Sequence, residues 1–123
     1  MLRFGTDGVR GVAFTELTTD YVTSLGVAAA GVLGGGTWLV GRDTRESGPE
    51  LEAALVRGLC AAGAQVELLG VVPTPALAFH SAARMCPAAM ITASHNPFAD
   101  NGVKLFAPGG VKLSDTIERR IEA

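Results

Sequence analysis

The sequence is poor in several features that mark large classes of proteins. It has 2 cysteines, Cys60 and Cys86, which lack metal-ligand spacing and stand within apolar segments, so we interpret them as buried free thiols. With 10 basic and 12 acidic residues the net charge is -2, and no basic stripe offers a site for a nucleic acid or an anionic membrane. The longest apolar run, residues 25–33, is too short to span a bilayer. We therefore expect no nucleic-acid partner and no membrane partner.

The start of the chain also lacks a signal peptide, because residues 1–7 turn to glycine and charge before any apolar run develops. A cytoplasmic location is the resulting expectation. The apolar content is 48%, and the 16 glycines form no low-complexity tract, which favours a folded globular protein. At 123 residues the chain is expected to form one domain around one core.

Short strands and helices are predicted to alternate along the chain. Glycine, proline and capping residues mark the ends of four predicted helices. The first is at residues 21–33, with its cap at residues 18–20, and the second runs from the capping-box spacing Ser47–Glu50 to Gly63. The third runs from Pro73 to about Met85, and the fourth follows Ser114. Strands are predicted at 37–40, 65–70, 88–92 and 103–106, with turns at 100–102 and 108–110. This alternation predicts a three-layer α/β/α sandwich with a mixed, mostly parallel sheet and an antiparallel edge strand.

Two polar segments each follow a predicted strand. They are GRDTR at residues 41–45 and ASHNP at residues 93–97. Open α/β sheets bind their ligands beyond the carboxyl ends of the strands, so we expect both segments at the same rim of the sheet.

The residues from 91 to 104 concentrate hydroxyl, imidazole, amide and amine groups within a few positions. Ser94 has no G-x-S-x-G elbow, so an acyl-transfer triad is not indicated. His95 is adjacent to Ser94 in extended backbone, where the two side chains diverge, so an orienting role suits it better than that of a base. From the residues alone, a serine and asparagine turn before Pro97 explains the segment equally well.

Two cations stand out near this segment in the expected fold. Arg10 is flanked by glycine and suits phosphate recognition, whereas an ordinary surface charge is the commoner interpretation. Lys104 follows the predicted Asn–Gly turn by two residues, which points it back toward the preceding loop, although a solvated edge-strand lysine is commoner. No P-loop or dinucleotide fingerprint is present, and His80 has no second histidine at metal spacing.

Taken together, the motifs of the chain resemble the N-terminal domain of the α-D-phosphohexomutase family in order and spacing. Their GTDGVRG and ASHNPFADNGVKLF forms are closer to the phosphoglucosamine mutases than to phosphomannomutases or phosphoglucomutases. The resemblance implies that residues 1–123 are the phosphoserine-bearing domain and that the later domains lie outside them. The motifs that carry it are FGTDGVRG (4–11), GRDTR (41–45), PTPA (73–76), ASHNP (93–97) and DNGVK (100–104).

The resemblance also implies roles for individual residues. Ser94 is expected to carry the phosphoryl group and, through that phosphate, to bind Mg²⁺. Arg10, Asn96 and Lys104 are expected to contact the active-site phosphate, with Lys104 as a general acid or base. His95 is expected beside the phosphoserine as part of the catalytic set.

The reaction implied is the conversion of glucosamine 6-phosphate to glucosamine 1-phosphate through a 1,6-bisphosphate, a step of amino-sugar metabolism toward UDP-N-acetylglucosamine. Glucosamine 1,6-bisphosphate, or glucose 1,6-bisphosphate, is the expected phosphorylating activator. Family members have further domains that supply a magnesium loop, sugar selectivity and a phosphate clamp, so the isolated domain is expected to be inactive. Its partners are then a phosphosugar and the rest of the parent chain, with self-association through the exposed inter-domain face. A phosphomannomutase or phosphoglucomutase domain and a non-catalytic phosphate-binding module are the alternatives.

Overall fold

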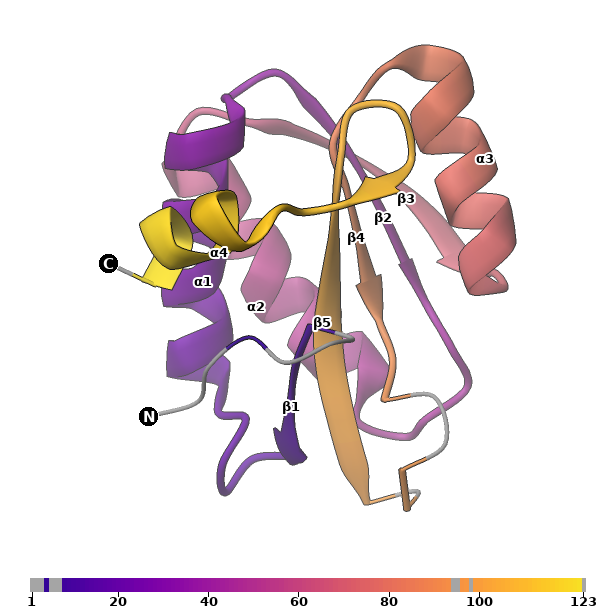
Figure 1. Ribbon diagram of the computed structural model, residues 1–123. Helices are drawn as coiled ribbons and strands as arrows, with labels where there is room; N and C mark the ends of the chain where they lie inside the picture. The colour runs from indigo at the N-terminus through magenta and orange to yellow at the C-terminus, as the bar shows by residue number, and fades with distance from the viewer. Residues whose placement is uncertain (1–3, 5–7, 94–95, 98, 123) are drawn as a thin grey trace.

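The computed structural model describes residues 4, 8–93, 96–97 and 99–122. In this part of the chain a six-stranded sheet has the order β1-β5-β4-β2-β3, and β6 pairs with β5 (Figure 1). The strands are β1 (Val9–Val12), β2 (Thr37–Arg42), β3 (Gln65–Val71), β4 (Ala88–Ile91), β5 (Asp100–Ala107) and β6 (Val111–Lys112). The helices are α1 (Thr19–Leu33), α2 (Gly48–Ala61), α3 (Thr74–Arg84) and α4 (Asp115–Glu122). None of the described helices is long and apolar enough to cross a membrane.

Helices cover both faces of the sheet. Figure 1 shows α1, α2 and α4 on one side and α3 on the other. Alternate residues of β2 feed two apolar clusters, with Trp38 and Val40 packing in the larger one and Leu39 packing with Leu77 of α3 in the smaller. The predicted three-layer α/β/α sandwich is therefore confirmed.

The sheet has a parallel part and an antiparallel part. Strand β2 is parallel to both β3 and β4, whereas β5 is antiparallel to both β4 and β1. The predicted mixed sheet is confirmed, and β5, the strand of opposite direction, is flanked by β4 on one side and β1 on the other. Strand β1 thereby brings the start of the chain next to residues about ninety positions later, with Arg10 opposite Gly102.

The predicted turn at residues 100–102 is wrong, because these residues begin β5. Asn101 is fully buried and Gly102 faces Arg10 across the sheet. A Cβ on Gly102 would lie 2.6 Å from the carbonyl oxygen of Val9 and 2.8 Å from that of Thr92. Asn–Gly therefore serves here as a compact, buried strand segment that lets three chain segments approach one another, not as a hairpin turn.

The predicted capping box at the start of α2 does not form. Ser47 is in the right-handed helical region (φ -75°, ψ -10°) and makes no side-chain capping bond. Its hydroxyl oxygen instead accepts a hydrogen bond from Nδ2 of Asn101 at 2.8 Å. The predicted cap of α1 does form, since the Thr18 hydroxyl oxygen accepts from the amide of Tyr21 at 3.1 Å.

The interpretation of both cysteines as buried thiols is wrong. Cys60 is exposed on α2, and Cys86 is half-buried after α3. The helical pattern of α2 places Leu51, Leu55 and Leu59 inward, and Cys60 is on the outer side of the same helix.

Candidate functional site

The two polar segments meet at one rim of the sheet, as predicted from their positions after strands. Strands β2 and β4 are parallel neighbours, so their carboxyl ends lie together. The amide of Asp43, just after β2, donates to the carbonyl oxygen of Ile91, the last residue of β4, at 3.1 Å. The segment 43–45 therefore lies directly against the start of the segment that contains Ser94.

A partly buried hydrogen-bond network joins these segments. Oδ2 of Asp43 accepts a hydrogen bond from the Thr92 hydroxyl at 2.7 Å and forms an ion pair with Nη1 of Arg45 at 2.5 Å. The Arg45 amide also donates to Oδ1 of Asp43 at 3.0 Å. Thr92 is 5% exposed and Arg45 is 7% exposed, so the network is largely shielded from water.

Asn96 is the point where three segments converge. Its side-chain oxygen accepts from Nη1 of Arg10 at 3.0 Å, and its backbone oxygen accepts from Nη2 of Arg45 at 2.8 Å. Its Nδ2 donates to Oδ2 of Asp100 at 3.2 Å. Two of the predicted site residues, Arg10 and Asn96, are thus brought into contact although they are 86 positions apart in the sequence.

Lys104 shares a face of the sheet with Arg10. Alternation along β5 places Gly102, Lys104 and Phe106 on the same side, and a Cβ on Gly102 would lie 2.8 Å from Cγ of Arg10. Nζ of Lys104 lies 5.5 Å from the ring centroid of Phe106. Strand alternation, and not an Asn–Gly turn, therefore sets the side of the sheet on which Lys104 lies, and its predicted contact with a phosphate stays a prediction.

The electrostatics of the rim keep Asp43 ionised. Burial by itself raises the pKa of the Asp43 carboxyl, but hydrogen bonds from the Thr92 hydroxyl and from Arg45, together with the Arg45 charge, more than offset it. The net effect is a pKa below the usual value of 3.8. The carboxylate is thus a fixed negative charge that holds Arg45 in place.

Ser94 and His95 lie outside the described residues, so their predicted catalytic roles stay predictions. The described residues on either side of them are close together, since the Asn96 amide donates to the carbonyl oxygen of Ala93 at 3.0 Å. Ala93 is fully buried and Asn96 is half-buried. The segment is therefore anchored in the interior before position 94 and at the polar rim after position 95.

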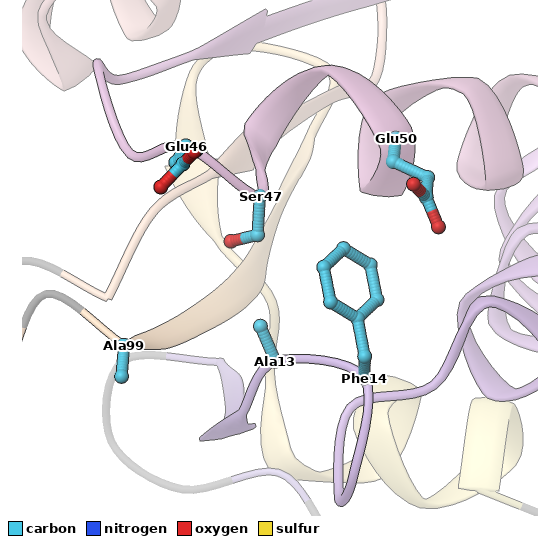
Figure 2. A pocket seen from close by; sticks show the side chains of 6 residues that line it. All are labelled: Ala13, Phe14, Glu46, Ser47, Glu50 and Ala99. Carbon is cyan, nitrogen blue, oxygen red and sulfur yellow. The ribbon is translucent and has the colours of Figure 1, made fainter.

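A hollow of about 530 Å³ lies between the loop after β1, the start of α2 and Ala99 (Figure 2). Glu46, Ser47 and Glu50 line it together with Ala13, Ala99 and the half-exposed ring of Phe14. Two carboxylates and no basic side chain among its lining residues make it a poor site for a phosphate. The surface around Arg10 and Asn96 is the better candidate.

The described residues do not by themselves form a magnesium site. Oδ2 of Asp43 already accepts from Thr92 and Arg45, and Oδ2 of Asp100 accepts from Asn96. In the described part of the chain no three His, Cys, Asp or Glu side chains are grouped so that they could hold a metal ion. Magnesium needs oxygen ligands in near-octahedral geometry, and this rim supplies hydrogen-bonded carboxylates instead.

The sequence alone assigns no role to Asp43, Arg45 or Thr92. It places the motif GRDTR after a strand, but it gives no partner for Asp43 or Arg45. The contacts of Asp43 with Thr92 and of Arg45 with Asn96 span 49 and 51 positions, so no local pattern could have revealed these two contacts. The available signal was their position after a buried parallel strand.

The fold and the described site together define an α/β domain in which Arg10 and Arg45 both contact Asn96 at the rim of a sheet. The family model described as phosphoglucomutase/phosphomannomutase, alpha/beta/alpha domain I, matches residues 1–123. The chain belongs to this phosphoglucomutase/phosphomannomutase family.

Individual relatives agree with that assignment. The chain is 54% identical over 127 residues to proteins named phosphoglucosamine mutase from Rhodococcus jostii (strain RHA1) and Salinispora arenicola (strain CNS-205), which covers 98% of this chain and 28% of each relative. A crystal structure of a phosphoglucomutase/phosphomannomutase family protein from Burkholderia thailandensis superposes with a TM-score of 0.85 at 36% identity, over 97% of this chain and 28% of that one. The chain thus spans a little over a quarter of the length of these relatives.

Proposed function

We propose that residues 1–123 are the N-terminal, phosphoserine-bearing domain of a phosphoglucosamine mutase. The relatives with that name match 98% of the chain. The observation that carries the proposal is the hydrogen bond from Nη1 of Arg10 to the side chain of Asn96. Asn96 is two positions after Ser94 in the sequence, so this bond keeps the positive charge of Arg10 at a near neighbour of Ser94.

In this proposal Ser94 carries the phosphoryl group. The phosphate passes from Ser94 to the free hydroxyl of a glucosamine monophosphate, and the resulting 1,6-bisphosphate returns its other phosphate to Ser94. Arg10, Asn96 and Lys104 bind the transferring phosphate and offset its charge, and Lys104 acts as the general acid or base. His95 completes the catalytic set beside Ser94.

Mg²⁺ and a 1,6-bisphosphate activator are part of the same proposal. The metal would neutralise charge on the phosphate of Ser94, with its remaining ligands outside the described residues. Glucosamine 1,6-bisphosphate, or glucose 1,6-bisphosphate, would charge Ser94 before the first turnover. A cytoplasmic location is proposed with them.

The 123-residue chain alone is proposed to be inactive or nearly so. The rim carboxylates Asp43 and Asp100 are already hydrogen-bonded, and the chain spans only 28% of the length of a relative named phosphoglucosamine mutase. A coupled assay of the purified chain with glucosamine 6-phosphate checks this. Robust turnover by the chain alone would contradict it.

The phosphoserine assignment is tested with Ser94→Ala in the full-length protein that contains these residues. The matched control is Ser24→Ala, at an exposed position of α1. We expect Ser94→Ala to abolish transfer of phosphate from glucosamine 1,6-bisphosphate to the protein, while Ser24→Ala leaves the transfer unchanged. Activity that survives Ser94→Ala would show that another group carries the phosphate.

A second candidate is a phosphomannomutase or phosphoglucomutase, since the Burkholderia thailandensis neighbour is named for both activities. The ratio of kcat/KM values for glucosamine, mannose and glucose phosphates on the full-length protein decides between the candidates. A non-catalytic phosphate-binding module predicts binding of a phosphosugar with no phosphoryl exchange onto Ser94.

Self-association of the isolated domain is also proposed, through apolar side chains that the remaining chain would cover. Phe79 and Met85 near α3 and Leu68 and Val71 on β3 are all more than half exposed. Sedimentation of the 123-residue chain over a range of concentrations checks this. A monomer at every concentration would contradict it.

A further inference from the structure

We propose that Asp43 and Arg45 are positioning residues that hold the chain on both sides of Ser94 and thereby fix this serine for phosphoryl transfer. The inference rests on the proposed function of Ser94. It concerns residues that touch neither the phosphate nor the sugar in that proposal and that act through Thr92 and Asn96.

The first of the two anchoring contacts is at Thr92, two positions before Ser94. Oδ2 of Asp43 accepts from the Thr92 hydroxyl at 2.7 Å, across 49 positions of sequence. The Thr92 amide donates to the carbonyl oxygen of Gly102 at 2.9 Å, so Thr92 is fixed to β5 by its backbone and to Asp43 by its side chain. Thr92 therefore has little freedom to rotate or shift.

The second anchoring contact is at Asn96, two positions after Ser94. Nη2 of Arg45 donates to the backbone oxygen of Asn96 at 2.8 Å, across 51 positions of sequence. The same Asn96 accepts from Nη1 of Arg10 through its side chain. Arg45 thus fixes the backbone of the residue whose side chain contacts the proposed phosphate-binding arginine.

The contacts at Thr92 and Asn96 depend on each other, because Asp43 and Arg45 are themselves paired. Nη1 of Arg45 pairs with the Asp43 oxygen that accepts from Thr92, and the Arg45 amide donates to the other oxygen of Asp43. The side chain of Arg45 is 8% exposed, so water competes little for these bonds. A displacement of either Thr92 or Asn96 would therefore disturb the same short segment, residues 43–45.

The chemistry explains why such a unit matters for activity. Phosphoryl transfer depends on an in-line arrangement of the attacking and leaving oxygens, and a misplacement of about 1 Å costs on the order of 100-fold in rate. A planar guanidinium can reach Asp43 and the Asn96 carbonyl at once with separate nitrogens, whereas a lysine ammonium is a single point donor. Position 45 therefore requires the planar geometry of an arginine, and a positive charge alone is not sufficient.

The test uses Arg45→Lys and Thr92→Val in the full-length protein, with Arg84→Lys as the matched control. Arg84 forms an ion pair with Glu67 at an exposed position between α3 and β3. For each variant kcat, KM for the sugar phosphate, the rate of Ser94 phosphorylation by the bisphosphate, and the melting temperature are measured. We expect kcat and the phosphorylation rate to fall about 10- to 100-fold in both test variants, with KM within about 3-fold and most protein still folded. Arg84→Lys should match the unaltered protein.

The outcomes separate this inference from the function on which it rests. If the unaltered protein takes phosphate on Ser94 and both Arg45→Lys and Thr92→Val keep its rates, the positioning role is wrong. A loss of activity that only follows the unfolded fraction also overturns it. If Arg45→Lys does not fold, Thr92→Val carries the test, because valine keeps the shape of threonine and removes the hydroxyl bond to Asp43. Failure of the unaltered protein to phosphorylate Ser94 rejects the proposed function instead.

Discussion

Two arginine–carboxylate pairs in this domain have the same chemistry and different surroundings. Asp43 and Arg45 join two loops at the rim of the sheet, and their side chains are 26% and 8% exposed. Glu67 and Arg84 join β3 to α3, and theirs are 51% and 41% exposed. Among the residues that the structure describes, only the first pair makes additional hydrogen bonds to the neighbours of Ser94, at Thr92 and Asn96. An ion pair organises a site when it is shielded and shares its atoms with other groups, whereas an exposed pair contributes little.

A third pair shows that pairing with one cation does not by itself lower the pKa of a carboxyl group. Glu52 of α2 lies 3.5 Å from Nε of Arg42. Burial raises the pKa of the Glu52 carboxyl, and Arg42 only partly offsets it, so the pKa stays above the usual 4.5. At Asp43 the hydrogen bonds from Thr92 and Arg45 outweigh burial and lower the pKa. The number of donors that reach the carboxylate, and not the presence of one cation, accounts for the difference.

The largest effect on activity is expected when Arg10, at the rim of the sheet, is replaced, in comparison with the exposed Arg84. Arg10→Ala should lower kcat/KM of the full-length protein by about 100-fold or more, because it removes a charged donor that we place on the transferring phosphate. Arg84→Ala should leave kcat/KM unchanged. Steady-state kinetics measures both, and equal losses in the two variants would remove the functional distinction between these regions.

The next effect concerns the close packing of β5 against β1 and Thr92, beside the Asp43–Arg45 pair. Gly102→Ala would place a Cβ within 2.8 Å of the backbone oxygens of Val9 and Thr92, so we expect a loss of about 2 kcal/mol or more in unfolding free energy. Gly31→Ala is the matched control, because a Cβ there meets nothing within 4 Å. That variant should gain about 0.5–1 kcal/mol from better helix propensity. Urea titration measures both, and equal stabilities would show that the strands near Thr92 are loosely packed.

The partly buried carboxylate of Asp43 should affect the pH dependence of stability. The pKa of Asp43 is lower in the folded protein than in the unfolded one, so its contribution is present above about pH 4 and is lost as pH falls through the folded pKa. Asp43→Asn should lose about 2 kcal/mol at pH 7. The difference between this variant and the unaltered protein should shrink in acid. A constant difference from pH 7 to pH 3 would contradict the assignment.

The smallest effect is expected at Glu52, where the pH dependence of stability has the opposite sign to that at Asp43. Its pKa is raised by folding, so its contribution to stability is full below the usual 4.5 and declines as pH rises through the folded pKa. Glu52→Gln should change the unfolding free energy at pH 7 by less than about 1 kcal/mol, because the cost of burying the charge disappears together with the pairing to Arg42. Thermal melts from pH 4 to pH 8 check this. A strong loss at pH 7 would show that the pair is a major stabilising contact.

The features that could be predicted from the sequence are those set by local periodicity. The cap at Thr18, the apolar face of α2 and the strand–loop order at Gly41–Arg45 required no knowledge of distant residues. They were sufficient to predict the sandwich and to place two polar segments at one rim.

The features that could not be predicted depend on partners far along the chain. Residues 100–102 have the composition of a turn, but pairing with β1 makes them a strand, and burial of Asn101 diverts the Ser47 hydroxyl from its cap. The role of Arg45 depends on Asn96, which is 51 positions away. Local patterns carry no information on such contacts until the sheet order is known.

The central claim is that position 94 receives a phosphoryl group between two anchored neighbours. The most direct test is peptide mass spectrometry of the full-length protein after incubation with glucosamine 1,6-bisphosphate, with Ser94→Ala alongside. We predict that the peptide containing Ser94 gains the mass of one phosphoryl group in the unaltered protein, and that no peptide gains it in the variant. A phosphorylated peptide elsewhere in the chain, with the Ser94 peptide unmodified, would contradict the account.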